Sequence, residues 1–295
     1  MTPATTTPTE VSEDDKRFAL VRRTLSVPEL QPAWHKLLRI QGRPLTIDMD
    51  VWEGVTYGED PAQVLDVWEL NDLAPREGWP AVLFLHGGGW VKGHRDAFRV
   101  QAPLLARKGI LCASASYRLA PEHRWPAPLD DALAAIEALK GLQVDPERIA
   151  LWGVSAGGQL ALRAAQALGP DALRGVVTLG APTDLPALGD WPELELAFRP
   201  EDLADASPAL RDAPLPPVLA LHGGRDRAVP LDQLHRLVAR HPHVEALEVP
   251  RGDHMLRLPP GIGLRPHRQA RRWLAARLAD KQRGSKWKIR KKGKR

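Results

Sequence analysis

The sequence has a single cysteine and no long apolar run. Cys112 therefore cannot form a disulfide within the chain. No uninterrupted apolar run approaches the roughly 20 residues that a membrane-spanning helix needs, and the first residues, MTPATTTPTEVSEDDKRF, contain no apolar stretch of signal-peptide type. We expect a soluble, cytoplasmic protein without a membrane partner, in which Cys112 is a buried packing residue of the run GILCASASY.

Acidic residues are absent from the C-terminal segment. Residues 281–295, KQRGSKWKIRKKGKR, hold nine Lys or Arg and no Asp or Glu. The chain has 41 basic and 36 acidic side chains, so the other 280 residues hold 32 basic against 36 acidic ones. A run of like charges repels itself and buries little apolar area, so we expect 281–295 to be a disordered tail. We do not expect nucleic acid as a partner, except through non-specific phosphate contacts of this tail.

Apolar strand-like runs alternate with helical stretches along most of the chain. The strand-like runs cover residues 62–70, 81–85, 109–117, 148–152, 174–180, 217–221 and 244–249. Helical spacing of apolar residues appears at 128–141, 156–169, 231–240 and 264–281. The central runs are apolar throughout, which is typical of parallel strands buried on both faces. The alternation predicts an α/β fold over residues 16–280, with a mostly parallel sheet and helices on both faces.

Three segments do not fit the alternation. Residues 1–15 are rich in Thr, Pro and acidic side chains, and we expect them to be disordered. Residues 16–43 precede the sheet, and residues 181–216 separate two strands by far more than the roughly 2 to 6 residues usual for such connections. Residues 16–43 are mostly basic in charge and 181–210 mostly acidic. We therefore expect 16–43 and 181–216 to face each other as a small cap over the carboxyl edge of the sheet.

The stretch RIALWGVSAGGQLALRAA joins a strand-like run to a helical one through Gly153-Val154-Ser155-Ala156-Gly157. A strand that turns at once into a helix leaves little room, so its flanking positions favour residues without Cβ. Ser155 then projects from a sharp turn at the carboxyl end of a strand. The amide of Ala156 points from the helix N-terminus toward the place where negative charge would gather. The pattern indicates a nucleophile, and the alternative is a serine that only caps the helix.

Acyl transfer by a serine also needs a base, an acid that orients the base, and amides that hold the oxyanion. The run His86-Gly87-Gly88-Gly89-Trp90 follows a buried strand, and its missing Cβ atoms let backbone N–H groups approach a substrate oxygen. Together with the amide of Ala156, this loop would form the oxyanion hole.

Candidates for the acid and for the base each follow a strand-like run late in the chain. Asp226 follows PVLALHGG, 71 residues after Ser155, whereas Asp232 lies in an apparent helix and Asp184 in the long insertion. Asp226 is therefore the favoured acid, with a loop ion pair to Arg225 or Arg227 as the alternative. His254 follows the final strand and is the favoured base. We expect the other candidate histidines at the surface: His241, His243 and His267.

Four stretches closely resemble the α/β-hydrolase superfamily, in particular its hormone-sensitive-lipase-like and feruloyl-esterase-like carboxylesterases. They are HGGGW, YRLAPEHRWPAPLDDALAAIEAL, DPERIALWGVSAGGQLAL and HGGRDRAVP, and the resemblance covers about residues 62–280. It implies the α/β-hydrolase fold and hydrolysis of small-molecule esters of small acyl groups, with no metal or cofactor. It further implies a catalytic triad of Ser155, Asp226 and His254, with Gly88, Gly89 and Ala156 as oxyanion donors. His86 and Glu122 resemble scaffold positions.

Three other functions stay open on the sequence. HGGGW is also similar to the arylformamidase motif, so an activated amide is an alternative substrate, and a peptidase could use the same triad. The alternative from another class is a non-catalytic small-molecule binding protein of this fold. Such a protein has no need to keep every triad member, whereas this chain supplies all of them.

Overall fold

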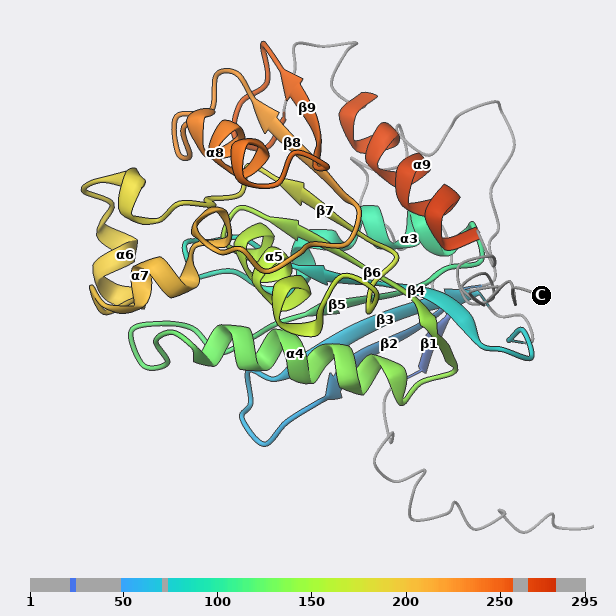
Figure 1. Cartoon of the computed structure of the whole chain (residues 1–295). Coiled ribbons are helices and arrows are strands. Elements are labelled where there is room, and N and C mark those ends of the chain that lie inside the picture. Colours follow the sequence, from blue (N-terminus) through green and yellow to red (C-terminus); the bar gives the residue numbers. More distant parts are fainter. Residues whose placement is uncertain (1–21, 25–48, 71–73, 257–264, 280–295) are drawn as a thin grey trace, which may run out of the picture.

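The computed structural model describes residues 22–24, 49–70, 74–256 and 265–279. Nine strands of this part form one sheet in the order β1-β2-β3-β5-β4-β6-β7-β8-β9 (Figure 1). The strands are β1 (Arg22–Thr24), β2 (Met49–Thr56), β3 (Val64–Leu70), β4 (Trp79–Leu85), β5 (Leu111–Ala115), β6 (Val144–Val154), β7 (Gly175–Leu179), β8 (Val218–Gly223) and β9 (Glu245–Val249). The α-helices are α3 (Gln101–Ala106), α4 (Ala127–Lys140), α5 (Ala156–Leu168), α6 (Pro192–Ala197), α7 (Asp202–Ala206), α8 (Asp232–Arg240) and α9 (Arg265–Ala279). Short 3₁₀ helices are η2 (Arg95–Phe98), η3 (Pro186–Leu188) and η4 (Pro208–Leu210).

The sheet is parallel except at one edge. The strands β5, β4, β6, β7, β8 and β9 pair in parallel, whereas β1, β2 and β3 join the β5 side antiparallel. The mostly parallel α/β architecture is thus confirmed. From β4 the chain crosses to β5 on one side and then returns to β6 on the other. Such a reversal of strand order opens a crevice at the carboxyl ends of the two central strands, where ligands bind in open α/β sheets.

Both faces of the sheet are covered by helices, with α4, α5 and α8 on one face and α3 and α9 on the other (Figure 1). Alternate residues of β4 belong to the two cores. Leu83 and Leu85 pack with the α4–α5 side, and Val82 and Phe84 with the α3–α9 side. Because successive side chains point to opposite faces and both faces are buried, the run is apolar throughout.

The antiparallel edge was not predicted. The predicted strands and helices are all present, with boundaries shifted by a few residues, but β1, β2, α3, α6 and α7 are additional elements. Within the proposed cap segment 16–43, only Arg22–Thr24 is described, and these residues pair with β2 at the sheet edge as β1. The remainder of that segment, residues 1–15 and the basic tail lie outside the described residues.

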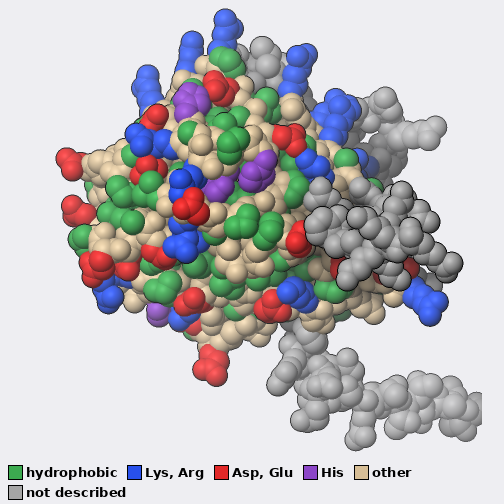
Figure 2. Space-filling model, viewed as in Figure 1, with side chains coloured by type: hydrophobic (Ala, Val, Ile, Leu, Met, Phe, Trp, Pro, Cys, Tyr) green, Lys and Arg blue, Asp and Glu red, His purple; other side chains and the backbone are tan. Residues whose placement is uncertain are grey.

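The surface of the described part carries charges of both signs. Figure 2 shows acidic and basic side chains interspersed over one face, with apolar patches between them. None of the described helices is long and apolar enough to span a membrane. Cys112, on β5, is buried as expected.

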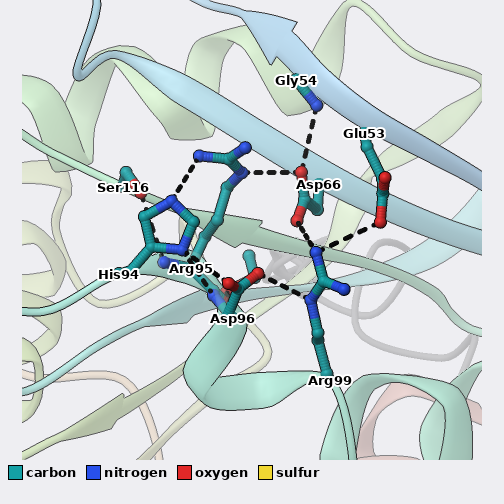
Figure 3. A network of polar contacts seen from close by, with 9 residues as sticks. Glu53, Gly54, Asp66, His94, Arg95, Asp96, Arg99 and Ser116 are labelled. Atoms are coloured by element: carbon teal, nitrogen blue, oxygen red, sulfur yellow. Dashed lines mark hydrogen bonds and ion pairs between the residues drawn. The ribbon is translucent and has the colours of Figure 1, made fainter. Parts of the chain in front are cut away.

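A buried carboxylate ties the antiparallel edge to the segment after β4 (Figure 3). Asp66 on β3 has a fully buried side chain, and its Oδ1 accepts hydrogen bonds from Arg95 Nε at 2.6 Å and from the Gly54 amide at 3.0 Å. The Arg95 carbonyl accepts a bond of 2.7 Å from the Ser114 hydroxyl on β5. These contacts fix η2 on the sheet, and with it the end of the loop that begins at His86.

Replacing Asp66 by Ala should lower the free energy of unfolding by about 3 kcal/mol, because it leaves the Arg95 guanidinium without its buried partner. Urea unfolding followed by circular dichroism measures the difference. The control is Asp96→Ala in the same network: this half-exposed carboxylate pairs with Arg99, so its loss should cost no more than about 1 kcal/mol. Equal losses for the two variants would contradict the anchoring role of Asp66.

Candidate active site

The turn between β6 and α5 holds Ser155 in a strained conformation. Its φ of 52° and ψ of −123° lie in a region that residues with a Cβ rarely adopt. The Ser155 amide donates a bond of 2.8 Å to the Leu179 carbonyl at the end of β7. A Cβ on Gly157 would lie 2.1 Å from the carbonyl oxygen of Leu85, and one on Gly153 would lie 2.1 Å from that of Gly157. The structure therefore contains the strand–turn–helix that the glycines predict.

The glycine loop after β4 lies directly against Ser155. The Cβ that Gly87 lacks would be 3.0 Å from Ser155 Cβ. Gly88 and Gly89 have φ values of 121° and 61°, and the Gly88 carbonyl accepts the amides of Val91 and Lys92 at 3.2 and 3.1 Å. This tight turn places the backbone of three glycines, which carry no side chains, beside Ser155 and the N-terminus of α5.

His86 is buried and packs against the glycine loop that follows it. Its ring stacks on Tyr117 with centroids 4.2 Å apart, and the Tyr117 hydroxyl donates a bond of 2.7 Å to the His86 carbonyl. Burial lowers the pKa of His86 to about 4, so the ring is neutral near pH 7. Its Nδ1–H donates to the Gly87 carbonyl at 2.8 Å. These contacts match the scaffold position that the resemblance implies, and Glu122 is exposed in the turn after Ala120.

His254 and Asp226 form a hydrogen-bonded pair. His254 Nδ1 lies 2.7 Å from Asp226 Oδ2, and because a carboxylate only accepts, Nδ1 carries the proton. The neutral ring then keeps a free lone pair on Nε2. Asp226 Oδ1 accepts the amides of Ala228 and Val229, both at 2.9 Å. The carboxylate thus binds His254 and the backbone instead of forming the alternative ion pair with its arginine neighbours.

The pKa of Asp226 reflects two opposing effects. Burial raises it, because the side chain is fully buried, but hydrogen bonds from His222, His254 and the Val229 amide lower it by more. The net result holds the pKa well below the usual range of an aspartate. Asp226 is therefore a carboxylate near neutral pH and accepts the Nδ1–H of His254.

Gly180 brings this pair close to Ser155. It follows Leu179, the residue whose carbonyl binds the Ser155 amide, and has a φ of 57°. A Cβ at Gly180 would lie 3.0 Å from His254 Nδ1 and 3.2 Å from Asp226 Oδ2. Gly180 was not predicted as a site residue, although a glycine directly after a buried strand is a signal for close backbone approach.

The long insertion between β7 and β8 packs on the glycine loop. Trp90 makes edge-on contacts with Phe198 and Trp191, at centroid distances of 4.7 and 5.7 Å. The side chain of Glu193 on α6 lies against Gly89, with Cγ 2.8 Å from the position of a Gly89 Cβ. This part of the insertion therefore lies beside the glycine loop, and its role as a cap stays a prediction.

Two acidic residues of the insertion form ion pairs within the described part of the chain. Asp184 binds Arg236 on α8 at 3.0 Å, and Asp205 lies 3.6 Å from Arg163 on α5 and also binds Arg211. Whether 16–43 also faces the insertion stays a prediction, because nearly all of that segment lies outside the described residues.

The prediction that His241 lies at the surface is wrong. His241 is buried instead of lying at the surface, with Nε2 3.3 Å from the Pro208 carbonyl, because it ends α8 beneath the insertion. Burial lowers its pKa. It remains distinct from the pair of His254 and Asp226, so the choice of His254 is unaffected.

Known proteins resemble this chain in sequence and in structure. Residues 82–195 match the family model described as alpha/beta hydrolase fold. Esterase LipC of Mycobacterium tuberculosis is 33% identical over 68% of this chain and 58% of its own length. Carboxylesterase NlhH of the same organism is 36% identical over 50% of this chain and 43% of its own. The chain thus spans about half the length of these curated relatives.

Solved structures share the fold. Esterase B from Lactobacillus Rhamnosis superposes with a TM-score of 0.66 at 19% identity, over 78% of this chain and 86% of its own. A hyperthermophilic esterase from the archaeon Pyrobaculum calidifontis superposes with a TM-score of 0.56 at 26% identity, over 72% of this chain and 80% of its own.

Replacing Gly180 by Ala should slow the labelling of Ser155 by a fluorophosphonate probe at least about tenfold, because the added methyl group displaces His254 from Asp226. The rate of covalent labelling, read by intact-protein mass spectrometry, measures the effect. Gly189→Ala is the matched control, since its φ of 67° imposes similar strain but no atom lies within 4 Å of the new Cβ. The geometric account fails if the two variants are labelled at the same rate.

Proposed function

Since the chain belongs to the α/β-hydrolase superfamily, we propose that it is a carboxylesterase that cleaves esters of small acyl groups through a covalent acyl-enzyme. The observation that carries the proposal is the 2.7 Å bond between His254 Nδ1 and Asp226 Oδ2, which is linked through Gly180 to the strained Ser155. Relatives named esterase and carboxylesterase support the ester as the substrate class.

In the proposed mechanism Ser155 Oγ attacks the ester carbonyl carbon while His254 Nε2 takes the hydroxyl proton. Asp226 keeps the second ring proton on Nδ1 and stabilises the imidazolium that forms. The tetrahedral intermediate collapses as His254 returns the proton to the leaving alcohol, and Ser155 is left acylated. Water then attacks the acyl carbon with His254 again as the base, which releases the carboxylic acid and restores Ser155.

The developing oxyanion is assigned to the amides of Gly88, Gly89 and Ala156. The loop that carries the two glycine amides lies against Ser155, and Ala156 is the first residue of α5. The helix N-terminus adds positive potential at that point. Each such donor is worth about 10²- to 10³-fold in rate, because it is fixed before charge develops.

Ser155→Ala should abolish labelling by a fluorophosphonate and reduce kcat on an ester by about 10⁴-fold or more, because triad members act as a unit. Peptide mapping of the labelled protein identifies the modified residue, and steady-state assay gives kcat. Thermal unfolding of the variant serves as the control for the fold. Retained turnover in a clean preparation of a folded variant would rule out Ser155 as the nucleophile.

The substrate class is tested on the unmodified protein with p-nitrophenyl esters of rising acyl length, beside N-formylkynurenine and a peptide anilide. We expect kcat/KM to be highest for a short acyl ester, and every activity to be lost in Ser155→Ala. A higher kcat/KM for the formyl amide would assign the arylformamidase reaction instead. Tight binding of these compounds without turnover would support the non-catalytic alternative.

A further inference from the structure

A second histidine, His222, lies beside Asp226 and takes no part in the proposed mechanism. His222 belongs to β8, and only 1% of its surface is exposed. Its Nε2 is 2.9 Å from the Val229 carbonyl oxygen and 3.4 Å from Asp226 Oδ2. The same oxygen of Asp226 accepts the bond from His254, so two imidazole rings converge on one carboxylate oxygen.

The chemistry of these contacts fixes the proton on His222. A backbone carbonyl and an ionised carboxylate can only accept, so Nε2 must carry hydrogen to satisfy either of them. The shorter distance identifies the Val229 carbonyl as the acceptor, and Asp226 Oδ2 lies 3.4 Å from the same nitrogen. His222 is therefore a donor in this arrangement and does not compete with Asp226 for a proton.

The contacts close a ring around the acid. The Val229 amide donates to Asp226 Oδ1, the Val229 carbonyl accepts from His222, and His222 also faces Asp226 Oδ2. Each end of the carboxylate is thereby fixed relative to residues 226–229. His222 is the member of the ring that comes from a strand, so it connects this turn to the rigid sheet.

We propose that His222 is a positioning residue for Asp226, whose Nε2–H holds the 226–229 turn and keeps Oδ2 directed at His254 Nδ1. The proposal rests on the function proposed above, since it assigns Asp226 as the orienting acid. It is supported by the low pKa of Asp226. Burial raises that pKa, and among the interactions that lower it the one with His222 is the largest.

Substitutions that change the position of the hydrogen-bond donor distinguish a positioning role of His222 from a role in packing alone. The amide nitrogen of Gln reaches the place of an imidazole Nε2, that of Asn reaches only the place of Nδ1, and Leu has no donor. His222→Leu and His222→Asn should therefore lower kcat on a p-nitrophenyl ester by about 10- to 100-fold with KM nearly unchanged, because His254 is misplaced and substrate contacts are intact. His222→Gln should restore kcat to within about threefold of the wild type.

His241 provides the matched control, because it too is a buried histidine with Nε2 near a backbone carbonyl but has no contact with Asp226. His241→Leu and His241→Gln should leave kcat unchanged. If His222→Leu does not fold, the comparison of Gln with Asn carries the test alone. Equal kcat for the Gln and Asn variants, or a change in KM alone, would overturn the proposal.

Proton NMR keeps this test independent of activity. The Nδ1–H of His254 should give a low-field signal in the full-length wild type and in Ser155→Ala, where no turnover occurs. The signal should persist in His222→Gln and be lost to exchange with water in His222→Asn. Its persistence in the Asn variant would refute the positioning role, whereas an inactive wild type with the expected signals would refute only the esterase function.

Discussion

Backbone crowding where β4, β6 and α5 meet is the constraint on which the rest of the site depends. A methyl group on Gly157 would lie 2.1 Å from the Leu85 carbonyl oxygen, so the start of the helix can rest on the end of β4 only while that residue is glycine. The same close approach brings Gly87 against Ser155. The strained backbone of Ser155 costs on the order of 1–3 kcal/mol, and it persists because the buried strands on both sides leave the turn no other path.

Helix α5 also binds the insertion between β7 and β8 through one polar face. Gln159, Arg163 and Gln166 follow one another at spacings that place them on the same side of the helix. Gln159 Nε2 donates to the Ala206 carbonyl at 2.6 Å, and Gln159 Oε1 accepts the Trp90 indole N–H at 3.0 Å. Gln166 Nε2 donates to the Pro208 carbonyl at 3.0 Å. The helix that begins directly after Ser155 thus also fixes part of the insertion.

The features that could be predicted from the sequence are those that depend on neighbours along the chain. Burial on both faces makes β4 continuously apolar, and a serine between glycines marks the β6–α5 turn. Gly180 was missed because it approaches Asp226 and His254, which follow two other strands, at distances that only the sheet order sets. His222 was missed although it is only four residues before Asp226, because the course of the loop after β8 brings the two side chains together. β2 was missed because a bulge between Trp52 and Val55 breaks its alternation. Two acids of the insertion, Asp184 and Asp205, have basic partners on α8 and α5, which sequence spacing does not reveal.

The pairing of β8 with β9 sets the geometry of the acid and the base. In the parallel register Gly223 is opposite Val249, so the two loops that follow leave the sheet side by side. The amide of Gly224 donates to the Val249 carbonyl at 2.8 Å and that of Arg225 to the Gly252 carbonyl at 2.9 Å. A Cβ on Gly223 would lie 2.3 Å from the Asp253 carbonyl oxygen, so backbone packs directly on backbone at this point. A shift of one residue in this register would separate Asp226 from His254, and the edge strand β9 is therefore as necessary to the proposed chemistry as the central strands.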